Sequence, residues 1–371
     1  MANLEQVLNE KRRNIHTQQY DMSVGELINL YRDGELFLNP VFQRFYRWSD
    51  IQKAKLIESI LMGIPIPPIY VSQREDGKWE VIDGLQRLST ILNFVGLLKD
   101  KDGQIQEPFE LLGTEDIPEL EGIKWDGDPE DEKKFTSTQR IDFKRSPLTI
   151  VIIKKISDFN AKYDLFQRLN TGGTTLSDQE VRNCLLIMED ETFFEYIDRL
   201  SNYPAFLDSI SLSDKSLSEQ ENIELVLKYF IFKNVDVAEI KEHNDLNSLI
   251  TSKAIEFCNP TTFDREYEEK LFMHTFDLIN STMGDTAFKK YNPSKEKASG
   301  GFLISGFEAI AIGIGYNLQE EKLISESLIE VKCQEIWAHD DFRVVSGSGS
   351  NAKRRLPVLI PLGKSFFAHE N

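Results

Sequence analysis

The sequence predicts an α+β protein: a first half that mixes strands with helices, followed by a mostly helical second half. Two β-rich segments, 68–73 and 78–83, flank a turn that ends in Asp-Gly, as in a hairpin. A β-branched run at 148–156 predicts a central strand. Beyond about residue 186, amphipathic helices follow one another without a convincing strand. These observations divide the chain into a polar N-terminal arm at 1–20, an α+β domain at 21–185 and a helical domain at 186–371.

The first elements after the arm are a helix and a short strand. Ser23 and Glu26 have the spacing of a capping box, in which the serine oxygen accepts a free backbone N–H and the glutamate reaches back. The helix that they begin should end near Gly34. The apolar residues after it predict a short strand that ends at Pro40.

A second helix is predicted over 51–62, because its apolar residues recur on one face, and either Ser49 or Asp50 caps it. Gly63 suits its C-terminal end, and the prolines that follow forbid continuation. The hairpin comes next. Its second strand continues directly into a Gly-containing turn and a mostly buried helix over 88–98.

The segment 100–140 is acidic and rich in Gly and Pro, and it is interpreted as an insertion or lid rather than as core. Residues 104–132 hold eleven acidic side chains and one lysine. The strand at 148–156 follows, and then a helix around 159–169. Ser177 and Glu180 form a second predicted capping box at the start of another helix.

The second half is predicted to be a succession of amphipathic helices around 223–232, 253–258, 268–279 and 328–337. Near its end, SGSGSNAKRR at 346–355 predicts a flexible, basic loop.

Composition and charge exclude several classes of protein. The 43 Lys and Arg against 61 Asp and Glu give a net charge of −18, which argues against nucleic-acid binding by bulk electrostatics. Residues 39–55 nevertheless carry four basic side chains and one acidic one, so a local basic face is compatible with this charge. No apolar run approaches the roughly 20 residues of a membrane span, and the N-terminus has no apolar signal core. The three cysteines are far apart and predict neither a zinc cluster nor a disulfide frame, which favours the cytoplasm.

The sharpest candidate site is the strand–turn–helix at Asp83-Gly84-Leu85-Gln86-Arg87. The glycine allows a tight turn, and the new helix points free N–H groups at whatever lies above it, which suits a phosphate. Arg87 adds a forked cation, and Asp83 is placed to hold Mg²⁺ or a water molecule. The plainer interpretation is a helix start in which Asp83 is the cap and Arg87 its ion-pair partner.

The second candidate is NPVFQRFYRW at 39–48. Its arginines and aromatic side chains suit stacking on bases and contact with phosphates. The alternative places the aromatic rings in the core and leaves the arginines solvated.

The third candidate runs from Arg168 through Asn170-Thr171-Gly172-Gly173 to Glu180 and Arg182. A Gly-Gly loop permits close approach of the backbone to a ligand, and the asparagine and threonine supply hydrogen bonds. The alternative is a polar connection between helices, with Glu180 serving only its capping box.

Other chemistries lack their motifs. No Walker-type phosphate loop and no G-x-S-x-G motif occurs, and the five histidines form no metal-ligand pattern.

These motifs, in this order, resemble the N-terminal domain of GmrSD-type restriction endonucleases, a family also described as ParB/sulfiredoxin-like. The resemblance rests on NPVFQRFYRW, GIPIPPIYV, VIDGLQRLSTIL and LFQRLNTGGTTLSDQEVRN, and it covers about residues 20–190. Its D-G-Q-Q-R motif is matched by Asp83, Gly84, Gln86 and Arg87, while Leu85 departs from it. Gln43 and Arg44 match the family's Q-R pair. Its N-x-G-G…E-x-R segment is matched by Asn170, Gly172, Gly173, Glu180 and Arg182.

The resemblance implies a ParB/sulfiredoxin-like core and a prokaryotic defence protein that binds and hydrolyses nucleotides, often coupled to a nuclease that cuts modified or foreign DNA. It implies a nucleoside triphosphate with Mg²⁺ as ligand. Asp83, Gln86 and Arg87 would be its catalytic residues, and phosphates would lie near Gln43, Arg44, Gly84, Arg168, Asn170, Thr171, Gly172, Gly173, Glu180 and Arg182. The family's C-terminal nuclease domain is not recognisable here, so we expect a nuclease partner and no DNA cleavage by the chain on its own.

Two other functions stay open. One is a DNA-binding module without turnover, with Arg47, Trp48, Lys353, Arg354 and Arg355 as contacts. The other is a ParB-like DNA-nicking nuclease that uses the same carboxylates.

Overall fold

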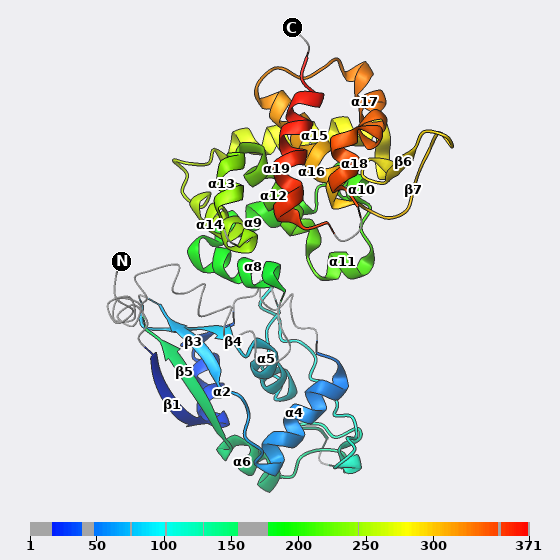
Figure 1. Ribbon diagram of the computed structural model, residues 1–371. Helices are drawn as coiled ribbons and strands as arrows, with labels where there is room; N and C mark the ends of the chain where they lie inside the picture. Colours follow the sequence, from blue (N-terminus) through cyan, green and yellow to red (C-terminus); the bar gives the residue numbers. More distant parts are fainter. Residues whose placement is uncertain are drawn as a thin grey trace. The chain divides into compact units, whose positions relative to one another are not determined.

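A computed structural model describes residues 17–38, 48–74, 76–100, 102–128, 130–154, 177–243, 245–347 and 350–369. The chain forms two compact units, residues 1–175 and 176–371. The first unit contains the sheet and the second is almost entirely helical, which confirms the predicted α+β class with a mostly helical second half (Figure 1). The predicted domain boundary near residue 185 falls within a helix of the second unit.

The sheet of the first unit has five strands in the order β1-β5-β3-β4-β2. They are β1 (Thr17–Ser23), β2 (Leu36–Phe37), β3 (Ile69–Gln73), β4 (Trp79–Asp83) and β5 (Pro147–Ile153). The predicted hairpin is present, because β3 and β4 pair antiparallel. The β-branched strand β5 lies inside the sheet, parallel to β3 on one side and antiparallel to β1 on the other.

Strand β1 contradicts the predicted polar arm at 1–20. The last residues of that arm belong to β1, which pairs with β5 from Thr17↔Ile153 to Ser23↔Pro147. The side chains of β1 are mostly exposed and polar, so they give no alternating pattern to recognise. The strand is an edge strand that forms because β5 offers it a partner, and a neighbour distant in sequence is invisible to local patterns.

Among the described residues of the first unit, four α-helices accompany the sheet: α2 (Val24–Arg32), α4 (Asp50–Met62), α5 (Leu85–Phe94) and α6 (Ser137–Arg145). Ser23 caps α2 by accepting the backbone N–H of Glu26, and Ser49 and Gln52 form a full capping box on α4. Gly63 ends α4 in the left-handed conformation, as predicted.

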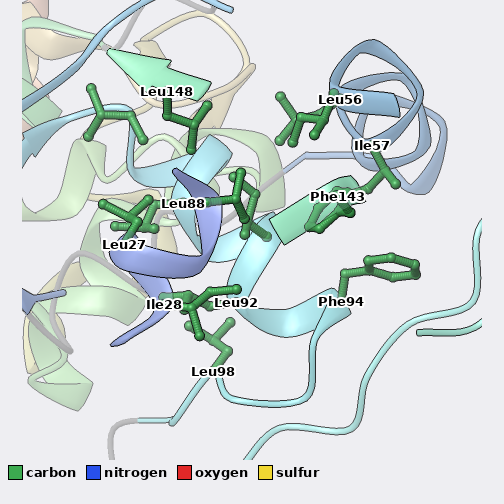
Figure 2. Packing of buried hydrophobic residues seen from close by; sticks show 14 of the residues in the cluster. Leu27, Ile28, Leu56, Ile57, Leu88, Leu92, Phe94, Leu98, Phe143 and Leu148 are labelled. Carbon is green, nitrogen blue, oxygen red and sulfur yellow. The ribbon is translucent and has the colours of Figure 1, made fainter. Parts of the chain in front are cut away.

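The core of the first unit lies between these helices and the sheet (Figure 2). Leu27 of α2 and Leu88 and Leu92 of α5 are fully buried within it. The acidic segment 100–140 also contributes, contrary to its interpretation as an insertion outside the core. Its Leu111 is fully buried and its Phe135 is 2% exposed, and the ring of Phe135 contacts Phe94 at a centroid distance of 5.2 Å. The acidic side chains of this segment therefore reflect its outer face. A few large apolar side chains, which the acidic composition does not indicate, anchor the segment to the core.

The second unit is built from helices of 5 to 19 residues. The α-helices are α8 (Asp178–Glu189), α9 (Glu191–Ser201), α10 (Pro204–Ile210), α11 (Asp214–Ser218), α12 (Glu221–Asn234), α13 (Val237–Glu242), α14 (Leu246–Glu256), α15 (Arg265–Met283), α16 (Ile304–Gln319), α17 (Ile329–Glu335), α18 (Asp340–Val345) and α19 (Ala352–Phe366). A short hairpin, β6 (Lys290–Asn292) with β7 (Lys297–Ser299), interrupts the helices and was not predicted.

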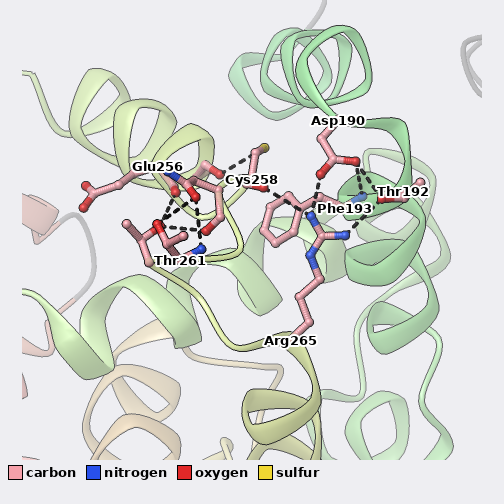
Figure 3. Close-up of polar contacts among 10 residues, drawn as sticks. Asp190, Thr192, Phe193, Glu256, Cys258, Thr261 and Arg265 are labelled. Carbon is pink, nitrogen blue, oxygen red and sulfur yellow. Dashed lines mark hydrogen bonds and ion pairs between the residues drawn. The ribbon is translucent and has the colours of Figure 1, made fainter.

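Polar contacts fasten the helices of the second unit to one another. In Figure 3, the guanidinium of Arg265, at the start of α15, donates to the carboxylate of Asp190 at 2.5 Å and to the hydroxyl of Thr192 at 3.0 Å. Asp190 is also the N-cap of α9 and accepts the backbone N–H of Phe193. A single carboxylate therefore caps one helix and holds the beginning of another.

The predicted basic loop at 346–355 is shorter than expected. Asn351 accepts the backbone N–H of Lys353 and starts α19, so Lys353, Arg354 and Arg355 lie in a helix. α19 forms even though Pro357 and Pro361 lie inside it, where each lacks a backbone N–H for the helix. No helix in the described part of the chain is long and apolar enough to cross a membrane.

Candidate functional site

The predicted strand–turn–helix is present as β4, Gly84 and α5. Gly84 has φ +93°, a left-handed backbone conformation that side chains with a Cβ rarely adopt. A Cβ at this position would lie 3.0 Å from Cγ1 and 3.3 Å from Cα of Ile69. Both the turn and the closeness of β3 therefore require glycine here.

The N-terminus of α5 has no side-chain cap. Gly84 is the N-cap residue, and it has no side chain that could accept a hydrogen bond from the first turn. The first intrahelical acceptor bond runs from the backbone N–H of Leu88 to the carbonyl of Gly84 at 2.9 Å. The preceding N–H groups, of Leu85, Gln86 and Arg87, point along the helix axis with a partial positive charge, an arrangement that favours anions.

Arg87 is held beside this helix end by three acceptors. Its Nη2 donates to Oδ2 of Asp83 at 2.8 Å, and its Nη1 donates to the carbonyl of Pro68 at 2.9 Å and to that of Pro67. The side chain of Arg87 is 13% exposed and that of Asp83 is 31% exposed. The plainer sequence interpretation predicted an ion pair between Asp83 and Arg87 and a helix cap at Asp83. The ion pair is confirmed, but the N-cap is Gly84.

Gln86 joins the helix to the end of the 39–48 segment. Its Oε1 accepts the backbone N–H of Trp48 at 3.3 Å, and its backbone carbonyl accepts the hydroxyl of Thr90 at 2.7 Å. Trp48 itself packs partly buried against the core, as the core-packing alternative predicts for the aromatic residues of this segment. The first and second sequence motifs thus meet at Gln86.

Asp83 keeps one oxygen for other partners, since its Oδ1 accepts no hydrogen bond from a described residue. Nowhere in the described ranges do three His, Cys, Asp or Glu side chains gather to hold a metal ion. A magnesium site at a phosphate typically uses only one or two carboxylates and takes its other ligands from phosphate and water. The lone Asp83 carboxylate fits that kind of site.

Eight of the eighteen predicted site residues lie outside the described residues. These are Gln43, Arg44, Arg47, Arg168, Asn170, Thr171, Gly172 and Gly173. Their convergence with Asp83 and Arg87 stays a prediction. Asp83, Gly84, Gln86 and Arg87 are brought together in the first unit, and Glu180 and Arg182 belong to the second.

Glu180 and Arg182 both have hydrogen-bond partners within the second unit. Glu180 forms the predicted capping box with Ser177: its Oε2 accepts the backbone N–H of Ser177 at 2.8 Å, and its own N–H donates to the serine hydroxyl at 3.2 Å. Arg182 is fully buried, and its guanidinium donates to the hydroxyl of Thr251 at 3.2 Å and to the side chain of Gln179.

The three candidate DNA contacts at the start of α19 differ from one another. Lys353 and Arg354 are exposed, and neither forms an ion pair with a residue that the structure describes. Arg355 is 8% exposed and donates to both carboxylate oxygens of Glu308, at 2.5 and 2.9 Å. In this structure Arg355 anchors the helix, and only the two residues before it face solvent.

The sequence analysis missed the carbonyls of Pro67 and Pro68, which orient Arg87. The sequence held a signal for these acceptors. A Pro-Pro pair next to a strand cannot continue a helix, and proline has a carbonyl but no N–H. Ile69 was missed as well, although its backbone fixes the need for Gly84.

The comparisons with known proteins agree with the motifs. The family model of the GmrSD restriction endonuclease N-terminal domain matches residues 24–187. No curated protein and no solved structure matches the chain. This match covers less than half of the chain and confirms the resemblance seen in the motifs, and similarity to this domain implies a role in a restriction or anti-phage system.

Proposed function

We propose that the chain is a nucleotide-binding protein that hydrolyses a nucleoside triphosphate and gates a nuclease partner within its restriction or anti-phage system. The observation that carries the proposal is the turn at Gly84. It combines a helix N-terminus without a side-chain cap, a fixed guanidinium and a partly exposed carboxylate within five residues of sequence. Phosphate recognition needs this combination of oriented N–H donors and a forked cation.

In this proposal the phosphates lie above the first turn of α5. The N–H groups of Leu85, Gln86 and Arg87 donate to phosphate oxygens, and the Arg87 guanidinium compensates their charge. The Asp83 carboxylate is 31% exposed, so Arg87 can exchange it for a phosphate without leaving a fully buried carboxylate unpaired.

Asp83 holds Mg²⁺ or the attacking water, and Mg²⁺, when bound, neutralises the charge that develops on the phosphates. In the hydrolysis step the water oxygen bonds to the terminal phosphorus, the bond from that phosphorus to the bridging oxygen breaks, and the water gives up a proton. Leu85 replaces a residue with an amide side chain in the family motif, so positioning of the water rests on Asp83 and Gln86.

The test is a titration of the full chain with ATP, GTP, CTP and UTP plus Mg²⁺ by calorimetry, followed by measurement of phosphate release. We expect one nucleotide to bind and its release rate to fall in Asp83→Asn. Asp76→Asn is a matched control, because Asp76 lies on the neighbouring turn and away from α5. Absence of binding by all four nucleotides contradicts the proposal.

A second function is favoured by one specific observation, the exposure of Lys353 and Arg354. If these residues contact DNA, the double variant Lys353→Ala/Arg354→Ala should weaken duplex binding and reduce its salt dependence by about two phosphate contacts. The same samples, incubated with plain and modified plasmid and Mg²⁺ or Mn²⁺, test for nicking. Cleavage that disappears in Asp83→Asn would favour the nuclease function over the proposed one.

A further inference from the structure

The two edges of the sheet in the first unit differ in length. At one edge lies β2, which contains only Leu36 and Phe37. At the other edge lies β1, which contains seven residues and pairs with β5 in unbroken register from Thr17 to Ser23. Proteins commonly keep edge strands short, because an exposed row of N–H and C=O groups can pair with another chain. β2 follows this rule, and β1 does not.

The outer side of β1 presents its backbone groups to a further strand. In an antiparallel pair, every second residue points its N–H and C=O away from the partner strand. No backbone hydrogen bond joins this side of β1 to a residue that the structure describes, and Figure 1 shows β1 (dark blue) at the margin of the sheet, beside β5. The strand TQQYDMS contains no proline, no lysine and no bulge, the usual devices that protect an edge. β1 is therefore a complete template for strand pairing.

The side chains of β1 suit pairing with a second copy of the same strand. When two copies run antiparallel and are centred on Tyr20, the facing pairs are Thr17 with Ser23, Gln18 with Met22, Gln19 with Asp21, and Tyr20 with Tyr20. Tyr20 is 45% exposed, and a cross-strand pair of aromatic rings stabilises a sheet. Asp21, the only charged residue of the strand, faces an amide in this register. A register centred on Asp21 would instead place two carboxylates opposite each other, which is unfavourable.

The distribution of charge also favours a second copy over a basic partner. A net charge of −18 makes two copies repel one another over most of their surface. β1 carries one charge in seven residues, and the Oδ1 of that residue, Asp21, accepts the hydroxyl of Thr149 on the neighbouring strand at 2.6 Å. The strand is therefore a nearly uncharged strip at which two acidic molecules can touch, and it offers little for a basic partner to recognise.

We propose that β1 is the contact surface between two copies of this chain, which pair antiparallel about a two-fold axis at Tyr20. Such a contact uses the same patch on both copies and joins two five-stranded sheets into one continuous sheet. Because β1, β5, β3 and β4 are successive neighbours, that sheet carries both Gly84 turns. A single pair of strands is small for an interface, so the dimer is weak and depends on concentration. The proposal does not rest on nucleotide binding.

Sedimentation velocity of the full chain, from low to high micromolar concentration, tests the dimer. Gln19 is exposed, so its substitution leaves the fold intact. Gln19→Lys places a cation opposite Asp21 of the second copy, twice by symmetry, and should lower the dissociation constant by about threefold or more. Gln19→Asp creates two like-charge pairs and should raise the dissociation constant by a similar factor. Gln73→Lys and Gln73→Asp are the matched controls, because Gln73 is exposed on β3, an inner strand of the sheet.

A further variant, Tyr20→Ala, removes the central aromatic pair and should weaken the dimer by about fivefold. Circular dichroism checks its fold, and the Gln19 variants carry the test if it unfolds. A wild-type chain that stays monomeric at the highest concentration refutes the proposal. A dimer that weakens in both Gln19 variants, ignores them, or responds equally to the Gln73 variants also refutes it, because the contact then lies elsewhere or in another register. Opposite shifts confined to the two Gln19 variants support the proposal, whatever the nucleotide titration gives.

Discussion

Two arginine–carboxylate pairs of this protein have similar chemistry and different surroundings. In the first unit, Arg87 and Asp83 are one helical turn apart, with side chains 13% and 31% exposed. In the second unit, Arg355 and Glu308 come from different helices and are 10% and 1% exposed. The two arginines are almost equally shielded, so the contrast lies in the access of the two carboxylates to water.

Access to water decides what each pair can do. The Arg87 guanidinium can exchange its carboxylate for a phosphate, since the Asp83 carboxylate, which is 31% exposed, stays partly solvated when the guanidinium leaves. Arg355 cannot make that exchange, because its departure would leave the buried Glu308 carboxylate without a counter-charge. Arginine at a motif position is therefore weak evidence for ligand contact until its burial is known.

The sharpest test of this contrast is Glu308→Ala. We expect it to lower the free energy of unfolding by about 3–5 kcal/mol, because it leaves the buried Arg355 cation without a counter-charge. Urea denaturation followed by circular dichroism measures the effect. The double variant Glu308→Leu/Arg355→Leu should recover most of the loss, since it removes both charges and fills the space. If Glu308→Ala costs less than about 1 kcal/mol, the pair is effectively solvated and the contrast with Arg87 fails.

The converse is predicted for Arg87→Ala. Nucleotide binding should weaken by about 1.5–3 kcal/mol, the value of a charge-assisted contact, while the melting temperature changes little. Arg74→Ala is the matched control, because Arg74 is a neighbouring cation on the hairpin that does not reach α5. Calorimetric titration measures the binding and a thermal melt the stability. A collapse of the melting temperature in Arg87→Ala would instead show that its bonds to Pro67 and Pro68 are structural.

Local signals predicted much of the fold. The capping box at Ser177, a helix cap at Ser49 or Asp50 and the helix end at Gly63 could be predicted because helix ends are specified by neighbours within four residues. The edge strand at Thr17–Ser23 and the buried Phe135 were not, since each depends on a partner far away in the sequence. Pro357 and Pro361 disfavour a helix at 352–366, but packing nevertheless stabilises one there.

For the candidate site, the sequence located the turn and the type of ligand but could not distinguish the roles of its arginines. Arg87, Arg182 and Arg355 all belong to predicted site or contact residues. Their exposures differ, and exposure follows from which helix packs over each side chain. Spacing along the chain does not contain that information, so the distinction required coordinates.

A smaller effect is expected at the turn itself. Gly84→Ala should destabilise the first unit by about 2 kcal/mol, through both its left-handed backbone and the collision of the new Cβ with Ile69. Gly77→Ala shares the left-handed backbone, at φ +83°, but its Cβ would meet no atom within 4 Å. The difference between the two melting temperatures isolates the crowding. Equal losses would show that β3 can move away, and that the turn is less rigid than a preformed phosphate site requires.

The smallest effect concerns the Asp190–Arg265 pair of Figure 3, in which the Asp190 carboxylate, 23% exposed, is intermediate between the carboxylates of Asp83 and Glu308. Burial raises the pKa of Asp190, but hydrogen bonds from Thr192, Arg265 and the Phe193 N–H outweigh this, so the pKa lies below its ordinary value of 3.8. A carboxyl whose pKa is lowered by folding stabilises the protein above that ordinary value. The contribution is lost as the pH falls through the folded-state pKa.

Asp190→Asn keeps a good N-cap and removes only the charge. It should therefore lower the free energy of unfolding by less than about 1 kcal/mol at pH 7. The cost should shrink as the pH falls from about 5 to about 3, because the wild-type carboxyl then becomes neutral too. Asp236→Asn is the control, since Asp236 caps α13 and has no ion pair with a described residue. Urea denaturation at each pH gives both differences. A cost for Asp190→Asn that does not change with pH would mean that the Asp190 charge contributes nothing, and that this intermediate pair behaves as a simple helix cap.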